Sequence, residues 1–149
     1  MELTPQEQEK LEELCRMSFD FARNNDTESL ELLLKHGLNP NLANHKGDSL
    51  LMLASYHNSI ECVKLLLEYK AEVDKVNDKN LTPLSGVCFK GYVEVAKLLL
   101  EHGADPDKDN GMGMTPMGFA IMFRRKEIVK VLQKYSKKKI GFFKRLWLR

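Results

Sequence analysis

The residues of this 149-residue chain that are best suited to chemistry are an adjacent tyrosine and histidine, Tyr56 and His57. Both residue types ligate haem iron, the tyrosine through its phenolate oxygen and the histidine through a ring nitrogen. Haem is therefore a candidate cofactor, with Tyr56 as the first ligand candidate. The motif Cys-x-x-Cys-His, which attaches haem covalently, does not occur in the sequence. The alternative interpretation is that the pair makes a polar aromatic contact with a protein partner.

Signatures of catalysis and metal binding are missing from the sequence. It contains no nucleotide-binding glycine fingerprint, no Gly-x-Ser-x-Gly nucleophile elbow and no His-Glu-x-x-His zinc motif. The Gly-Met-Gly of residues 111–113 neither follows a strand nor opens a long helix. Cys15, Cys62 and Cys88 lack paired metal-ligand spacing, and we interpret Cys62 and Cys88 as packing residues. We expect no enzyme activity, no metal site and no small-molecule substrate.

Two phrases recur along the chain at a fixed spacing. Leu32-Leu33-Leu34-Lys35-His36-Gly37 returns as residues 65–70 and 98–103 and, in degenerate form, as residues 131–135, each time 33 residues further on. A second phrase keeps the same step, as Ser49-Leu50-Leu51, Thr82-Pro83-Leu84 and Thr115-Pro116-Met117. Two independent phrases in phase indicate a stack of repeats, in which neighbours bury each other's apolar faces.

The period and the second phrase resemble the ankyrin repeat, whose signature is Thr-Pro-Leu-His-x-Ala. Residues 82–107 match best, although the signature histidine is absent throughout the chain. The resemblance implies an all-α ankyrin-repeat solenoid of helix-turn-helix units with hairpin-like finger loops. Residues 1–139 would form four repeats, at about 11–43, 44–76, 77–109 and 110–139, with an N-terminal capping helix. Residues 140–149 would form a basic aromatic C-terminal tail.

Local signals agree with helix pairs. Thr82 can cap a helix that has proline at its first position, and Gly37 and Gly103 stand where a helix should end in a left-handed turn. Thr4-Pro5-Gln6-Glu7 is a capping box, which predicts a first helix over about residues 5–24. Three further residues of that helix are expected to point inward, namely Leu11, Leu14 and Phe21.

The resemblance also implies a function, because the concave face of ankyrin-like stacks binds partners. We expect a non-catalytic protein–protein interaction module, since interfaces favour the aromatic residues and methionines found here. A contiguous apolar patch is predicted from Leu81, Phe89, Met112, Met114, Met122 and Phe123. The register assigns eleven residues to the whole face: Tyr56, His57, Tyr69, Leu81, Phe89, Lys90, His102, Met112, Met114, Met122 and Phe123.

The alternative function is that of a haem-binding or haem-delivery accessory protein for an enzyme such as catalase. It follows from the resemblance, because short single-domain bacterial ankyrin proteins include some that are linked to catalase and to haem supply. Tyr56 and His57 would then bind the haem. The protein-binding interpretation needs no cofactor.

Charge is unevenly distributed along the chain. The net charge is +2, but residues 1–133 carry 16 Lys and Arg against 21 Asp and Glu, whereas residues 134–149 carry seven Lys and Arg and no acid. Three interpretations of the tail stay open: it caps the last repeat, it makes weak contact with an anionic membrane surface, or it binds an acidic partner or nucleic acid. The acidic body argues against nucleic acid, because it would repel a duplex.

The composition is that of one globular domain, with 43% apolar and 30% charged residues. Apolar runs fall far short of the roughly 20 residues that a membrane-spanning helix needs. The first residues are acidic and contain no apolar stretch, unlike a secretory signal, and an odd number of cysteines fits a reducing compartment. We therefore expect a cytoplasmic protein.

Overall fold

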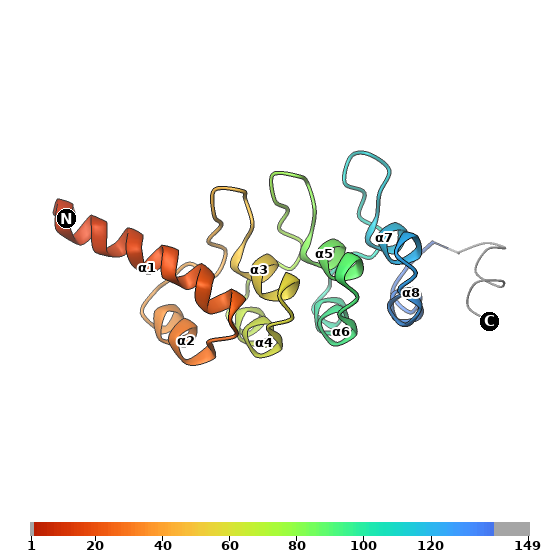
Figure 1. Cartoon of the computed structure of the whole chain (residues 1–149), viewed down its shortest axis with the longest axis horizontal. Helices are drawn as coiled ribbons and strands as arrows, with labels where there is room; N and C mark the ends of the chain where they lie inside the picture. The colour runs from red at the N-terminus through yellow and green to blue at the C-terminus, as the bar shows by residue number, and fades with distance from the viewer. Residues whose placement is uncertain (1, 139–149) are drawn as a thin grey trace.

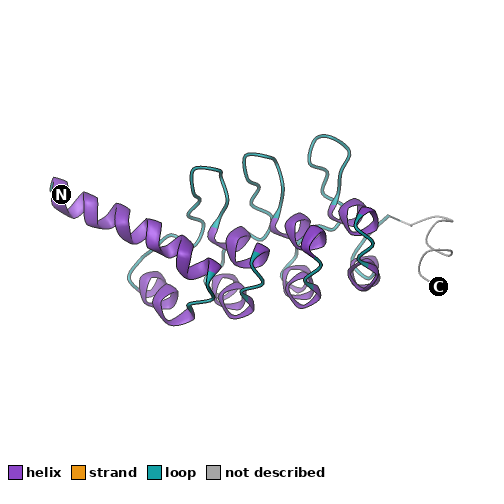
Figure 2. Ribbon diagram, viewed as in Figure 1, coloured by secondary structure: helices purple, strands orange, loops and turns teal. Residues whose placement is uncertain are grey.

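The computed structural model describes residues 2–138 and arranges them as consecutive helix pairs (Figures 1 and 2). Within these residues no strand is formed, apart from one isolated antiparallel bridge between Ala43 and Ser49. No helix of this part of the chain is both long and apolar enough to span a membrane. The helices are α1 (Pro5–Arg23), α2 (Thr27–Lys35), α3 (Leu50–Tyr56), α4 (Ile60–Glu68), α5 (Pro83–Lys90), α6 (Val93–Glu101), α7 (Pro116–Met122) and α8 (Lys126–Gln133).

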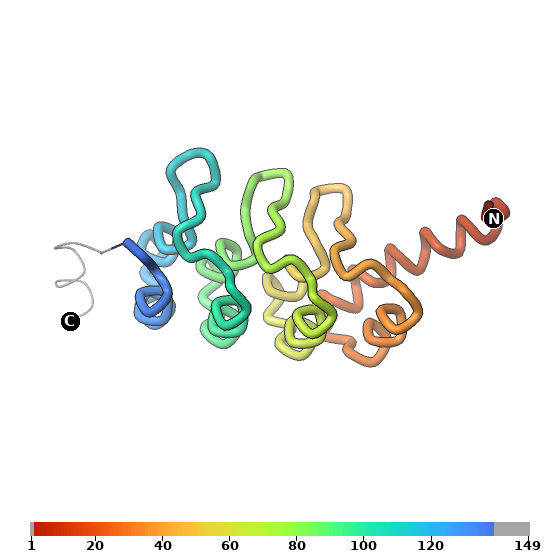
Figure 3. Tube along the Cα trace, turned by 180° about the vertical axis from the view of Figure 1, so that it is seen from behind, coloured from red at the N-terminus to blue at the C-terminus, as the bar shows by residue number. Residues whose placement is uncertain are grey.

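The helices form two layers. The first helices of the pairs, α1, α3, α5 and α7, make one row, and the second helices, α2, α4, α6 and α8, make the other (Figure 1). Three finger loops project on the side of the first helices, and Figure 3 shows the same order from behind. Each helix packs against its partner and against its counterpart in the neighbouring pair. The predicted all-α solenoid is therefore confirmed.

Hydroxyl side chains begin the first helices after each finger. The oxygens of Ser49, Thr82 and Thr115 accept hydrogen bonds of 3.0, 3.2 and 3.0 Å from the backbone N–H three residues further on. Each bond satisfies one of the donors that a helix leaves free at its N-terminus. Proline follows two of these caps, Thr82 and Thr115, in the first helical turn, where its missing N–H is not needed.

The second helices end in left-handed turns, as predicted at Gly37 and Gly103, whose φ angles are 99° and 92°. The equivalent residue of the second repeat is Lys70, which holds a φ of 65°. A side chain costs free energy in this region, so Lys70 is a strained position. Arg124 is a second one, with a φ of 56° where the other repeats have asparagine or glycine.

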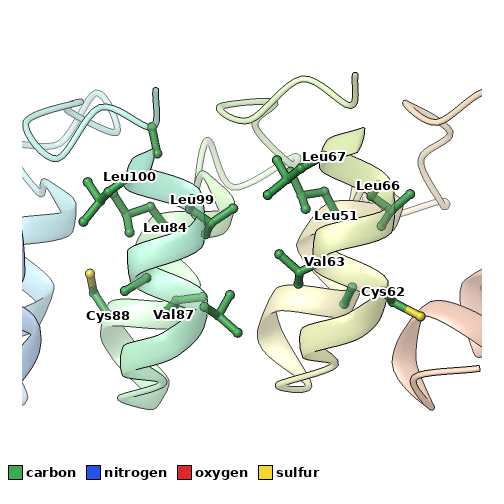
Figure 4. Packing of buried hydrophobic residues seen from close by; sticks show 14 of the residues in the cluster. Leu51, Cys62, Val63, Leu66, Leu67, Leu84, Val87, Cys88, Leu99 and Leu100 are labelled. Atoms are coloured by element: carbon green, nitrogen blue, oxygen red, sulfur yellow. The ribbon is translucent and has the colours of Figure 1, made fainter. Parts of the chain in front are cut away.

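The core lies between the two layers (Figure 4). Leu51 and Leu66 of the second repeat and Leu84 and Leu99 of the third are wholly buried. The small residues that the sequence placed at helix crossings, Ala54, Val87 and Ala120, are wholly buried as well.

The cysteines predicted to pack in the interior do so. Cys62 and Cys88 are both wholly buried. Burial raises the pKa of the Cys62 thiol to about 11 and also raises that of Cys88, because a buried thiolate loses its hydration. Both thiols stay protonated at neutral pH and act as small apolar groups.

The first helix corrects one expectation. α1 begins and ends as predicted, with the Thr4–Glu7 capping box formed, and Phe21 packs against the core. Leu11 and Leu14, however, are 49% and 41% exposed. The inward face was right, but α1 has 19 residues and α3 only seven, so the earlier turns of α1 extend beyond anything that could cover them.

Candidate binding surface

Three aromatic rings from successive first helices form a continuous row, which we call the ring ladder: Tyr56, Phe89 and Phe123. The rings of Tyr56 and Phe89 are parallel, with centroids 6.4 Å apart and an interplanar angle of 3°. Phe123 meets Phe89 edge-on at 4.7 Å and 86°. Each of the three residues is between 36% and 39% exposed, so the ladder is an accessible apolar surface.

Helix packing places the rings together. Tyr56 ends α3, Phe89 is the next-to-last residue of α5, and Phe123 caps the C-terminus of α7. α3 packs against α5, and α5 against α7. Gly86 makes room for the first contact, because a β-carbon there would lie 3.1 Å from Cδ2 of Tyr56. The Tyr56 ring can therefore lie against α5.

Cationic groups border the ladder. The Lys90 ammonium lies 4.9 Å from the centroid of the Tyr56 ring, within the range of a cation–π interaction. The pKa of His57 is lowered, first by partial burial and then by the charges of Arg23 and Lys90. The Arg125 guanidinium donates two hydrogen bonds to the carbonyl oxygen of Phe89, at 2.9 and 3.2 Å. The surface is thus apolar at its centre and positively charged at its edge.

A hollow of about 470 Å³ adjoins the ladder at Tyr56. Its walls come from α3, α5 and the first two fingers, which are joined by a 2.9 Å hydrogen bond from the Asn77 amide to Asp48 and a 3.1 Å bond from the Asp78 N–H to the carbonyl of Lys46. The lining is apolar toward the helices and polar toward the fingers, and consists of His45, Lys46, Asp48, Met52, Leu53, Tyr56, Asn77, Asp78, Lys79, Leu81 and Gly86.

The residues of the predicted apolar patch fall into separate places. Phe89 and Phe123 belong to the ladder, and half-buried Leu81 lines the hollow. Met112, at 86% exposure, lies on the third finger, and Met122 is exposed at the end of α7. Met114 is half-buried, with its terminal methyl close to Gly118 of α7. None of the six is fully buried.

Two predicted residues of the concave face lie elsewhere. Tyr69 and His102 cap the C-termini of α4 and α6, which belong to the second layer. Tyr69 is partly buried against the core, and Nδ1 of His102 lies 2.8 Å from the carbonyl oxygen of Leu98 on its own helix. Their 33-residue spacing repeats a helix end, but it is the end of the wrong helix for the face bearing the fingers.

The haem-ligand candidates Tyr56 and His57 lie side by side, with ring centroids 6.0 Å apart and an interplanar angle of 76°. Tyr56 lines the hollow, whereas His57 is not part of its wall. Residues 2–138 contain no group of three or more His, Cys, Asp and Glu side chains that could hold a metal ion. The haem alternative stays a prediction, which a hemin titration of the wild type and Tyr56→Phe would test.

Sequence reasoning missed Gly86 and Arg125. Arg125 stands 66 residues after Ser59, whose hydroxyl donates a 2.8 Å hydrogen bond to the carbonyl of Arg23. Arg23 and Phe89 are also 66 residues apart, so the same contact between repeats recurs with a different donor. The register could have indicated Arg125, whereas no sequence signal marks Gly86.

The fold and this surface define a solenoid of stacked helical hairpins with a binding face beside its fingers. A family model of ankyrin repeats in three copies matches residues 19–110 and 70–141. An ankyrin repeat protein of Pseudomonas aeruginosa is 61% identical over 46 residues, which are 31% of this chain and 27% of that protein. The chain belongs to the ankyrin-repeat family, whose members generally act as protein–protein interaction modules.

Proposed function

We propose that this chain is a non-catalytic module that binds a segment of a partner protein on the ring ladder and the adjoining hollow. The observation that carries the proposal is the ladder itself. Three touching rings, each more than a third exposed, form the kind of aromatic surface that supplies most of the binding free energy in protein interfaces.

The border of the ladder indicates the chemistry of the partner segment. Lys90 and Arg23 act electrostatically on His57, and Lys90 also stands over the Tyr56 ring. A segment that places apolar side chains on the rings and a carboxylate beside Lys90 complements this surface. The acids Asp48 and Asp78 lie on the fingers and not in the ladder.

A matched pair of variants tests the proposal. Phe89→Ala with Phe123→Ala removes two rings of the ladder, while His102→Ala removes a ring from the second layer. Proteins captured by the tagged wild-type chain from cells of its source should be lost with the double variant and retained with His102→Ala. Helical circular dichroism should be the same for all three proteins, because the changed side chains are largely outside the core.

Retained capture by the folded double variant would show that the partner uses another surface. Lys90→Glu refines the same assay. If the partner places a carboxylate beside Lys90, reversing this charge weakens capture, and the loss is greatest at low salt because exposed charges are screened by ions.

A further inference from the structure

A second unpartnered surface lies on α1, independently of the ladder. The last two turns of α1 pack on the stack, where Ser18 and Ala22 are wholly buried. The turns before them project away from the other helices, as Figures 1 and 3 show. At 1.5 Å per residue, the 19 residues of α1 extend about 28 Å, whereas the seven residues of α3 extend about 10 Å.

The face that α1 buries against the stack continues as an apolar stripe along its projecting turns. Leu11 and Leu14 stand one and two turns before Ser18 on the same side of the helix, and Leu3 and Met17 are also exposed. A shallow hollow of about 480 Å³ runs along this stripe between Leu3 and Arg16. Helices seldom leave such a stripe in water, so it fits a contact with another chain segment.

The flanks of the stripe are acidic. Residues 2–17 contain five glutamates, Glu2, Glu7, Glu9, Glu12 and Glu13, against the two cations Lys10 and Arg16. Glu12 lines the hollow itself. An occupant must therefore supply both apolar side chains and positive charge.

One segment of this chain has that composition and lies outside the described residues. Residues 139–149 contain six large apolar side chains, four cations and no acid. We propose that residues 139–149 of one copy dock on the apolar stripe of α1 in a second copy. The large side chains cover Leu11 and Leu14, and the cations face the glutamates.

The position of the two surfaces makes the contact one between copies. α1 lies at one end of the stack, and α8, which precedes the tail, lies at the other (Figure 1). The projecting turns of α1 point away from the stack, and eleven extended residues span at most about 40 Å. A contact that joins unlike surfaces of two copies is head-to-tail, so it adds further copies as the concentration rises.

Trp147, the one tryptophan of the chain, reports on the proposed contact. Sedimentation velocity and Trp147 emission are measured on the full-length chain over a concentration series. We expect association and a blue shift of the emission to develop together. Added salt should reverse both, because the contact includes opposite charges.

Two sets of variants identify the surface. Leu11→Ser with Leu14→Ser should weaken association on the order of tenfold or more, whereas Leu32→Ser, which changes an exposed leucine on α2, should not. Glu12→Lys with Glu13→Lys, and separately Lys144→Glu with Arg145→Glu, should each abolish self-association. Mixing these two charge-reversed proteins should restore it, because each then offers the other a complementary surface.

Three results would overturn the proposal. The chain stays monomeric, with Trp147 emission independent of concentration or shifted only by anionic vesicles. The emission is already blue-shifted in the monomer and ignores the α1 variants, which places the tail on its own stack. Association occurs but neither the leucine variants nor the charge exchange affects it, which places the contact elsewhere. Circular dichroism confirms the fold of every variant.

Discussion

Two columns of rings repeat in this chain, and only one of them forms a connected surface. Tyr56 and Phe89, joined by Phe123, end the first helices and touch in succession. Tyr69 and His102 end the second helices with the same 33-residue step. Tyr69 turns into the core and His102 contacts its own helix.

The difference lies in how closely the two layers pack. Neighbouring first helices share more contacts than neighbouring second helices do. The glycine at position 86 and the alanines at positions 54 and 120 keep the first helices close, so rings at their ends meet. Equal spacing in sequence therefore defines equivalent positions, and the local helix separation decides whether equivalent side chains touch.

The largest expected effect tests whether stability and recognition belong to different layers. Leu99→Ala, in the second layer, should lower the free energy of unfolding by about 2–5 kcal/mol, because it leaves a cavity at a wholly buried site. Phe89→Ala should cost less than half as much, since its ring is already 39% exposed. Urea unfolding measures both. Equal losses would make the ladder part of the core and break the comparison.

A smaller effect separates the two sides of α5. Cys88 adjoins Phe89 but is wholly buried, so Cys88→Ser places a hydroxyl among apolar side chains and should cost about 1–3 kcal/mol. Cys15→Ser, at a half-exposed site on α1, is the control and should change little. Thermal unfolding of the two variants should differ by several degrees, and a similar effect of both would argue against a buried inner side of α5.

A stabilising change addresses the second layer alone. Lys70→Gly should raise the free energy of unfolding by about 0.5–1 kcal/mol, because it relieves the left-handed strain next to Tyr69. Gly103→Lys, the reverse change in the next repeat, should lower it by a similar amount. Since neither residue reaches the ladder, partner capture should stay unchanged. A destabilised Lys70→Gly protein would mean that the lysine side chain contributes more than its strained backbone costs.

The smallest effect concerns pH at the edge of the ladder. The pKa of His57 is lowered in the fold, so the unfolded chain binds the proton more readily. The His57 contribution to stability is present above about pH 6.5 and declines below it, until the pH passes the lowered folded-state pKa. We expect the wild type to lose under about 1 kcal/mol relative to His57→Gln between about pH 7.5 and 5. Parallel pH profiles of the two proteins in urea unfolding would contradict this.

The 33-residue period was sufficient to predict the helix pairs, their caps and the turns at Gly37 and Gly103, because these depend on local sequence. It also predicted that Phe89 and Phe123 are exposed. It could not predict that Leu11 and Leu14 are uncovered, since helical phase indicates a face and not what lies opposite. The left-handed turns at Lys70 and Arg124 were also missed, because neither residue type favours that conformation.

The division of the ladder among repeats has a consequence for how recognition responds to partial opening. Each helix pair is held by the pair before it and the pair after it, so fraying can begin at a terminal pair while the rest stays folded. If α7 and α8 detach, Phe123 leaves and the Tyr56–Phe89 pair persists as a shorter platform. Loosening of one end would thus reduce the grip on a ligand in steps of one ring, without an all-or-none loss.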